Sequence, residues 1–193
     1  MSHSPERRKR TRDRIRAMAA RLFKSNGYGS TTIDALMAEA GLTRGGFYAH
    51  FSGKEDLFAD IIQSSFDRLP DEPDPLRKVF TWYMSQEHRD YPAAGCPLPT
   101  LAQDVARLRG EPQQRYRHIF RNFTRLISGN VKGRTRHDRE AAATAIVAMM
   151  IGGMVVSRAL GKTACSDEVL DACRETCISL ADSAPSLAEP DDE

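Results

Sequence analysis

The sequence predicts an all-α fold, with an N-terminal three-helix domain that contains a helix-turn-helix motif and a larger helical domain after it. Apolar residues recur every three or four positions along most of the 193 residues, as they do on the buried side of amphipathic helices. Residues that cap helix N-termini precede several of these stretches, and prolines and glycines fall mainly between them. A chain of this length can bury a sizeable core, as one large domain or as two small ones.

The first helix is expected from about Arg7 to Asn26, after six N-terminal residues that we expect to be disordered. Its apolar stripe consists of Ile15, Met18, Ala19, Leu22 and Phe23. Gly27 follows the stripe, at a position where a left-handed residue commonly ends a helix.

A helix-turn-helix motif is predicted next. Thr31 and Asp34 have the spacing of a capping box, with Thr31 as the N-cap of a helix that ends at Gly41. A second, short helix is expected to begin after Thr43 and to end near residue 51. In such a pair the second helix is the one that enters the major groove of DNA.

A third helix is predicted from Ser52, which forms a second capping box with Glu55, to about Leu69. The acidic, proline-rich segment at residues 70–75 follows this helix. A segment of that composition favours a break between domains.

The predicted domains cover residues 7–69 and 74–184. The second is expected to hold five helices, at residues 75–90, 100–108, 112–128, 138–160 and 166–183. A loop at residues 91–99 and a basic loop at 129–136 lie between these helices. The acidic tail, residues 185–193, is expected to be disordered.

Charge is unevenly distributed along the chain. Residues 1–48 hold ten Lys and Arg residues and four acidic ones, for a net charge of +6, whereas the remainder sums to −4. A basic N-terminal part on a mildly acidic body is typical of a polyanion-binding module joined to a part that does not touch the polyanion.

The sequence argues against a membrane protein and against a metalloprotein. The longest uncharged stretch, residues 141–157, is shorter than a membrane span, so we expect a buried helix of a soluble protein. No apolar signal-peptide core begins the chain, and four cysteines are then expected as reduced thiols in a cytoplasm. Cys173 and Cys177 lie one helical turn apart without a third matching ligand, so no metal or other cofactor is expected.

The stretch TTIDALMAEAGLTRGGFYAHFSGKEDLF, residues 31–58, resembles the DNA-binding domain of the TetR family of bacterial transcriptional regulators. Its specific features are the Gly-Leu-Thr turn, a Phe-Tyr-x-His-Phe segment and a Ser-x-Lys-Glu-x-Leu segment. The resemblance begins at the basic first helix and covers roughly the first third of the chain. It implies a regulator that binds double-stranded DNA, with a C-terminal domain that binds a ligand and dimerises.

Arg44 opens the predicted reading helix, where its guanidinium can bond to O6 and N7 of a guanine. Gly45 and Gly46 weaken this helix, and the resemblance places their backbone close to the DNA. The resemblance also implies five phosphate-contacting residues: Thr32, Thr43, Tyr48, His50 and Lys54. On residue type alone Tyr48 and His50 are a surface aromatic and an ordinary histidine, but their spacing in the motif favours phosphate contact. Phe47 and Phe51 are expected in the core.

A basic run precedes the motif and consists of Arg7, Arg8, Lys9, Arg10 and Arg12. Such runs are usually a solvated surface. Ahead of a helix-turn-helix, we expect this one to lie along the DNA backbone or to enter a minor groove, with salt-sensitive binding.

The helix around Gly152 and Gly153 is apolar on nearly every side and rich in small residues, which allow a second helix to approach closely. Together with the resemblance, this predicts a homodimer through about residues 138–183; a buried helix of a monomer is the alternative. The resemblance also implies a ligand cavity among the middle helices. Its candidate lining is Trp82, Tyr83, Met84, Cys96, Tyr116, Phe120, Phe123 and Met149, each of which could equally be plain core.

We therefore predict a sequence-specific DNA-binding regulator, a homodimeric repressor that an unknown small-molecule effector releases from a palindromic operator. Two alternatives stay open: a sensor repressor that uses Cys96 as a reactive thiol, and a non-specific architectural DNA-binding protein. Cys96 lies in a predicted loop, but packing as a small apolar residue is the commoner role of a free cysteine. An enzyme is not expected, because the sequence lacks the glycine-rich, Gly-x-Ser-x-Gly, His-Glu-x-x-His and Cys-x-x-Cys motifs.

Overall fold

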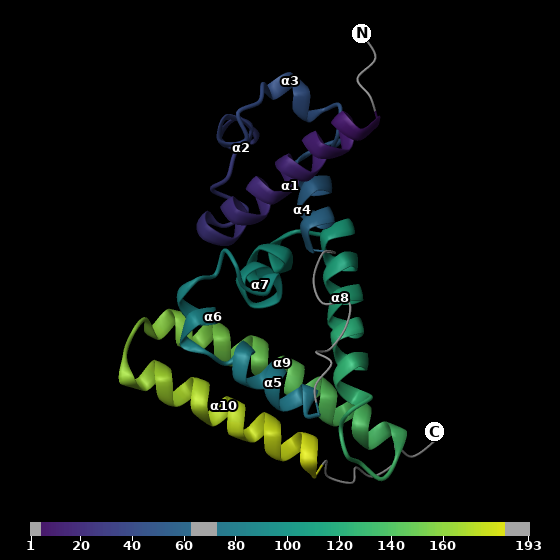
Figure 1. Cartoon of the computed structure of the whole chain (residues 1–193), viewed down its shortest axis with the longest axis vertical. Coiled ribbons are helices and arrows are strands. Elements are labelled where there is room, and N and C mark those ends of the chain that lie inside the picture. Colours follow the sequence, from purple (N-terminus) through teal and green to yellow (C-terminus); the bar gives the residue numbers. More distant parts are fainter. Residues whose placement is uncertain (1–4, 63–72, 184–193) are drawn as a thin grey trace. The chain divides into compact units, whose positions relative to one another are not determined.

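The structure is a computed structural model that describes residues 5–62 and 73–183. Within these residues it contains ten α-helices and no strand, so the predicted all-α class is confirmed (Figure 1). The chain divides into two compact units, and each is described here by itself. Unit 1 comprises residues 1–65 and 92–119, and unit 2 comprises residues 66–91 and 120–193.

Unit 1 is built around its N-terminal helix. Its helices are α1 (Pro5–Asn26), α2 (Ile33–Glu39), α3 (Arg44–Phe47), α4 (Lys54–Ile62), α7 (Pro97–Arg107) and the beginning of α8 (Glu111–Ser128). Helix α1 packs against α2, α4 and α7. Its buried Phe23 meets Phe58 of α4 edge to face, with ring centroids 5.4 Å apart. Helix α2 packs against both α1 and α3, and so connects the short helix α3 to this domain.

Helix α1 begins earlier than predicted. Pro5 and Glu6 belong to its first turn, so the expectation that both are disordered is wrong. Proline suits a first helical turn because its missing N–H has no acceptor there, and an acid is favourable at the positive helix end. The predictions for residues 1–4, for a third helix beyond Ile62 and for an acidic tail from residue 185 lie outside the described residues.

The N-cap of α2 is Thr32, not Thr31 as predicted. The Thr32 hydroxyl accepts the N–H of Ala35 at 3.1 Å. Thr31 is buried instead, and its hydroxyl donates to the carbonyl of Gly27 at 2.9 Å, at the end of α1. Both threonines suit an N-cap, and the hydrogen bond to α1 decides which of them turns inward.

The predicted bounds of the next two helices also need correction. Helix α3 has only four residues and ends at Phe47, and the following three residues form turns. Helix α4 begins at Lys54, and Ser52 bonds through its N–H and its hydroxyl to the carboxylate of Asp56 rather than forming a capping box with Glu55.

Unit 2 contains two long antiparallel helices that pack along each other (Figure 1). Its helices are α5 (Pro75–Tyr83), α6 (Gln86–Asp90), the remainder of α8, α9 (Arg136–Leu160) and α10 (Ala164–Asp182). Helix α5 packs on α10, and α6 packs on α9. The core of this unit therefore lies along one side of the α9–α10 pair.

Helix boundaries in the C-terminal two-thirds differ from the predictions because caps were missed. The predicted helix at residues 75–90 is broken where Ser85 caps α6 by accepting the N–H of His88. Helix α7 begins at Pro97 rather than near Thr100, whose hydroxyl donates to the carbonyl of Cys96. The other three helices begin one or two residues before their predicted first residues. Helix α8 begins at Glu111, α9 begins at Arg136 after a Thr135–Asp138 capping box, and α10 begins at Ala164 after its N-cap, Thr163.

The predicted domains at residues 7–69 and 74–184 remain a prediction, and compactness groups the chain differently. Residues 92–119 join the helix-turn-helix because they contact its scaffold. The carboxylate of Asp104 accepts the N–H of Tyr28 at 3.0 Å, and Lys24 donates to the carbonyls of Ala93 and Gly95.

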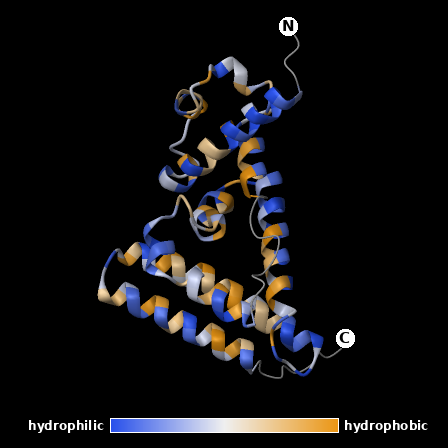
Figure 2. Cartoon of the chain, in the orientation of Figure 1, coloured by the Kyte–Doolittle hydropathy of each residue, from blue (hydrophilic) through white to orange (hydrophobic). Residues whose placement is uncertain are grey.

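Helix α9 is long and apolar enough, by length and composition alone, to cross a membrane, and no other described helix is. In its most apolar window, 39% of the residues are buried inside the chain. Figure 2 shows orange, hydrophobic residues along much of this helix. The helix packs on α10 in unit 2, but several of its small apolar residues are exposed, so the predicted buried helix is only partly buried within one chain.

Gly153 marks a place where three segments of unit 2 come too close for a larger residue. A Cβ there would lie 2.7 Å from Cys173 Sγ and 2.8 Å from Met84 Cε. We expect Gly153→Ala to lower the unfolding free energy by about 1–3 kcal/mol, as overpacked cores do. Thermal or denaturant unfolding measures this loss, and Cys173→Ala should restore part of it in the double variant. Equal stability of Gly153→Ala and the parent would contradict the packing described here.

Candidate nucleic-acid interface

The turn between α2 and α3 has the geometry of a helix-turn-helix. Gly41 has a φ of +61°, a left-handed conformation that a residue with a side chain rarely adopts. The N–H of Leu42 donates to the carbonyl of Met37 at 2.8 Å and closes the end of α2. Phe47 and Phe51 are buried as predicted, with ring centroids 5.8 Å apart, and anchor the short helix α3 to the domain.

Arg44 lies at the start of α3 and is exposed, but it is not unpartnered. Its Nη1 donates to Asp34 Oδ2 at 2.6 Å, and about 60% of each side chain is exposed (62% and 61%). An exposed pair of this kind contributes at most about 1 kcal/mol, so it is no barrier to a new contact. A guanidinium has five N–H donors, and the fork remains able to bind a base edge while Asp34 holds one of them.

The two glycines of α3 differ in their surroundings. A Cβ on Gly45 would meet no atom within 4 Å, and one on Gly46 would make only ordinary contacts with Thr43 and Met37. Packing within unit 1 therefore gives no reason for a glycine at position 45. Close approach by another molecule's backbone or phosphate would give one.

Thr43 and Tyr48 are exposed on the same short helix and its ends. Tyr48 is 55% exposed, and its ring packs edge to face on Phe47. Thr43 occupies the N-cap of α3 without a side-chain hydrogen bond to the helix, in contrast to Thr32 on α2. Both hydroxyl groups are placed where they could donate a hydrogen bond to the oxygen of an external phosphate.

Lys54 has a larger structural role than the sequence indicated. Its ammonium donates to the carbonyls of Tyr28 at 2.8 Å and Thr31 at 2.9 Å and lies 4.1 Å from the centre of the Tyr28 ring. Burial lowers the pKa of Lys54, and the charge of Asp104 opposes that shift. Two of its three N–H bonds thus hold α4 to the connection between α1 and α2, which leaves one for a phosphate.

The basic run lies on helix α1, and two of its arginines hold α1 to the end of the motif. Arg8 donates to the carbonyl of Ala49 at 2.9 Å. Arg12 donates to the carbonyl of His50 at 2.7 Å and to Asp60, and its guanidinium lies 4.3 Å above the Phe51 ring. These two hydrogen bonds use two of the five N–H donors of Arg12 inside unit 1, and its role in the backbone-contacting arm remains a prediction.

A hollow of about 580 Å³ lies between the start of α1 and α3. It is lined by Arg7, Arg8, Thr11, Leu42, Thr43, Gly46, Ala49 and His50. The pKa of His50 is lowered, first by partial burial and then by the charges of Arg8 and Arg12. The predicted phosphate-contacting residues Thr43 and His50 thus share one hollow with Arg7 and Arg8 of the basic run.

The predicted ligand-lining residues are divided between the two compact units, and their gathering around one cavity remains a prediction. Cys96 and Tyr116 belong to unit 1, and the other six belong to unit 2. Tyr83, Met84, Cys96 and Phe123 are buried, whereas Trp82 is 43% exposed. Burial of Tyr116, together with the nearby Cys96, raises the pKa of the Tyr116 phenol to about 12, and the phenol donates to the carbonyl of Leu98.

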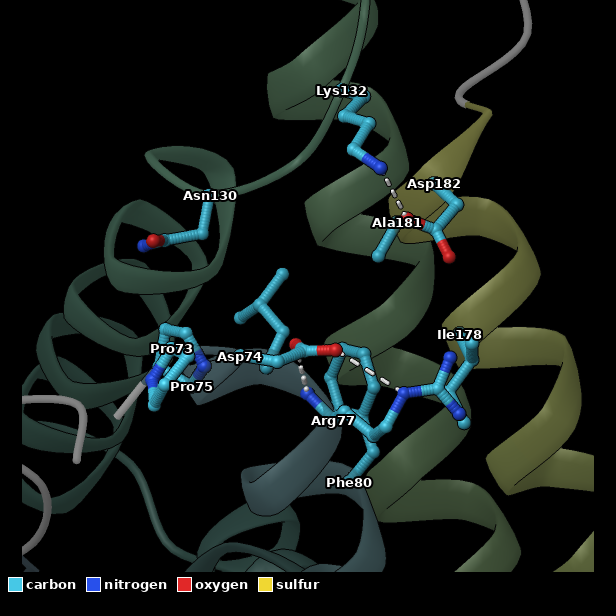
Figure 3. Close-up of a pocket in the computed structure, with 11 residues that line it drawn as sticks. Pro73, Asp74, Pro75, Arg77, Phe80, Asn130, Lys132, Ile178, Ala181 and Asp182 are labelled. Atoms are coloured by element: carbon cyan, nitrogen blue, oxygen red, sulfur yellow. Dashed lines mark hydrogen bonds and ion pairs between the residues drawn. The ribbon is translucent and has the colours of Figure 1, made fainter. Parts of the chain in front are cut away.

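Unit 2 has a hollow of about 310 Å³ that the sequence did not indicate (Figure 3). Its apolar wall includes Leu76, Phe80, Ile178 and Ala181. Its polar rim holds two ion pairs, Arg77–Asp74 at 3.1 Å and Lys132–Asp182 at 2.8 Å. Its lining is mixed, with slightly more polar than apolar surface, and its volume is at the lower end of the range for small-molecule sites.

Metal binding and thiol chemistry find little support among the described residues. No group of three or more His, Cys, Asp or Glu side chains among residues 5–62 and 73–183 could hold a metal ion. Cys177 is buried, and this burial and the nearby Cys173 raise its pKa to about 12, which makes it a poor metal ligand or nucleophile.

A short helix with an exposed N-terminus, anchored by two buried aromatic residues after a glycine turn, defines a helix-turn-helix DNA-binding protein. A family model described as "Bacterial regulatory proteins, tetR family" matches residues 15–61. Residues 15–61 are therefore similar to the helix-turn-helix DNA-binding domain of TetR-family transcriptional regulators, and the family match covers this part of the chain alone.

Similar proteins match either the helix-turn-helix region or most of the chain. The transcriptional regulator AcrR of Shigella flexneri is 44% identical over 55 residues, which are 28% of this chain and 26% of AcrR, so that match spans about a quarter of the relative. YxaF of Bacillus subtilis (strain 168), an uncharacterized HTH-type regulator, is 24% identical over 161 residues, 76% of this chain and 84% of YxaF. A TetR-family regulator structure from Agrobacterium tumefaciens has a TM-score of 0.71 and 18% identity over 91% of this chain and 100% of its own. That likeness shows the fold.

Proposed function

We propose that the chain is a homodimeric, sequence-specific repressor that binds a palindromic operator and leaves it when a small-molecule effector binds. Its partners are double-stranded DNA, a second copy of itself and the effector, and its place is the cytoplasm. The observation that carries this proposal is the exposed start of α3, held rigidly by the buried Phe47 and Phe51. A rigid short helix with a free N-terminus is what the major groove accepts.

In this proposal the interface residues divide by task. Arg44 reads a guanine, with Asp34 holding one edge of its guanidinium, while Gly45 and Gly46 let the DNA come close. Phosphate contacts come from Thr32, Thr43, Tyr48, His50 and Lys54, and from Arg7, Arg8, Lys9 and Arg10 on α1. With one long side chain at the base edges, DNA shape contributes to sequence preference.

An uncovered stripe on α9 supports the homodimer. The stripe consists of Ala145, Ala148, Gly152, Val156 and Ala159, which are all exposed and follow each other at three- and four-residue spacing. Val156 is 48% exposed, and a Cβ on Gly152 would meet no atom within 4 Å. Small apolar residues on one helical face allow an identical helix from a second copy to pack closely, as a two-fold interface requires.

Footprinting on DNA selected from a random pool tests the proposal. A dimeric repressor protects a short palindrome in a fixed register, whereas the alternative, an architectural protein, covers DNA without register. The DNA fragments selected from the pool could share no common sequence, and DNA affinity could vary with salt concentration alone. That result would support the architectural alternative and contradict sequence-specific binding.

The contact of His50 with phosphate predicts a pH effect. In the free protein its pKa is lowered by burial, Arg8 and Arg12, so the neutral form predominates at neutral pH. A phosphate beside the ring would favour the charged form and raise that pKa. Because the complex then binds a proton, operator affinity should rise as pH falls from about 8 to 6, and should level off below the pKa of the free protein.

Operator affinity measured at constant ionic strength across this pH range checks the effect. His50→Gln should bind with an affinity that changes little with pH over the same range. A pH dependence that is the same in both proteins would remove His50 from the phosphate contacts.

The effector site is the least constrained part of the proposal. The hollow of Figure 3 offers an apolar wall with charged groups around it and is a candidate in addition to the predicted lining residues. The thiol-sensor alternative loses support, because Cys96 is only 2% exposed and caps α7 instead of lying in an open loop. Alkylation of the thiols that leaves operator affinity unchanged would exclude it.

A further inference from the structure

Unit 2 carries a second concentration of positive charge. Between Arg121 and Arg139 the sequence holds six Lys and Arg residues and one acid, a net charge of +5 in a chain whose total is +2. The acid, Asp138, is 1% exposed, and its carboxylate accepts the N–H of Thr135 in the capping box of α9. Its charge therefore serves the start of that helix.

Three of these arginines surround one hollow of about 370 Å³ between the end of α8 and the start of α9. The hollow is lined by Arg125, Ser128, Gly129, Arg136, Arg139 and Glu140. Glu140 is the acid in this lining, and it bonds to Arg136 at 2.7 Å. Three positive charges thus face one negative charge.

Arg125 and Arg139 are held by neutral groups. Arg125 Nη1 lies 3.5 Å from Asn122 Oδ1, the outer limit of a hydrogen bond, and Arg139 Nη1 donates to the carbonyl of Gly133 at 3.3 Å. Each guanidinium has five N–H donors, so these contacts leave most of them for a ligand.

The local field is positive. The pKa of Glu140 is lowered, first by its hydrogen bond from Arg136 and the charge of that residue, and then by the charges of His137 and Arg125. The surroundings of this carboxylate therefore favour negative charge. An anion placed in the hollow would meet the same field.

We propose that this hollow binds a small anion that carries a polyphosphate or several carboxylates. Guanidinium groups bind carboxylate and phosphate oxygens through pairs of parallel N–H bonds, and a multiply charged anion would offset the repulsion among three of them. An apolar ligand would instead remove water from the guanidinium groups and offer them no hydrogen bond or opposite charge in return. The site goes beyond the proposed function and does not depend on it, because its residues lie outside the helix-turn-helix.

Isothermal titration calorimetry tests the site. The full chain is titrated with pyrophosphate and, separately, with citrate at fixed ionic strength. Saturable binding of one anion per chain is expected, and Arg125→Gln and Arg139→Gln should each weaken it by about tenfold or more. Arg121→Gln is the matched control, since it removes the same charge from an exposed position on α8 outside the lining, and should change the affinity less than about twofold. Pyrophosphate should also raise the melting temperature of the parent more than that of either lining variant.

Three results would overturn the proposal. Potassium chloride of equal ionic strength could reproduce the stabilisation, which would then be screening alone. Arg121→Gln could weaken binding as much as Arg139→Gln, as expected for a diffuse basic surface. Unchanged pyrophosphate binding in the lining variants, with weaker binding to random DNA, would assign these arginines to the DNA backbone.

Discussion

In the proposed homodimer, Gly152→Glu is expected to separate the two copies and to weaken operator binding by at least about 100-fold. The residue lies in the exposed small-residue stripe of α9, and space around it within one chain is open, so the monomer should fold normally. In a two-fold interface the new carboxylates of both copies would be buried close together without a partner. A single helix-turn-helix would then bind one half-site alone.

Light scattering after size-exclusion chromatography measures the mass, and titration of operator DNA measures the affinity. Gln114→Glu adds the same residue at an exposed position on α8, outside residues 138–183, and should leave both quantities unchanged. A Gly152→Glu protein that stays dimeric and binds the operator like the parent would exclude this stripe as the interface.

Arg44→Ala and Lys54→Ala are expected to weaken DNA binding in different ways. Loss of Arg44 should cost about 1–3 kcal/mol at the cognate sequence, relax the preference at one base pair and leave random DNA nearly unaffected. Its side chain is largely exposed, so the melting temperature should not change. Lys54→Ala should weaken binding to all sequences and also destabilise the domain by about 1–3 kcal/mol, because two charged hydrogen bonds to backbone carbonyls are lost.

Affinity for cognate and random DNA, together with thermal unfolding, separates these outcomes. Arg21→Ala removes another exposed ion pair of the same domain, the one with Glu39, and should change none of the three quantities. Equal effects of the Arg44 and Lys54 variants on cognate and random DNA would refute this division of tasks.

Local sequence patterns were sufficient for the scaffold of the motif. The left-handed Gly41 and the buried Phe47 and Phe51 all follow from spacing between neighbours in the chain. The cap of α2 was misplaced by one residue, because both threonines suit an N-cap and only Thr31 has an acid three residues further on, as a capping box requires. The bond from Thr31 to the end of α1 decides between them.

Contacts between distant residues could not be predicted in this way. Asp34 was assigned to a cap, yet it pairs with Arg44 ten residues away across the turn, beyond the reach of spacing rules within one helix. Lys54 was assigned to DNA from its place in the motif, and its bonds to Tyr28 and Thr31 depend on how α4 packs. The ligand lining had only aromatic residues at helical spacing as its signal, and these are the ordinary content of a helical core.

The arginine hollow shows the opposite case, in which the signal was present but its meaning depended on the fold. The basic loop near residues 129–136 is visible in the sequence. That Arg125 and Arg139 face the same hollow is visible only once the end of α8 and the start of α9 are in place.

The most direct test of the central claim is the binding of the full chain to a sequence selected from a random DNA pool, compared with a shuffled sequence of equal length. We expect binding of the selected sequence by a dimer on a two-fold symmetric site, at least about 1,000-fold tighter than binding of the shuffled sequence at physiological salt. Equal affinity for both sequences, falling together as salt rises, would contradict sequence-specific regulation and leave only the electrostatic attraction of a basic surface.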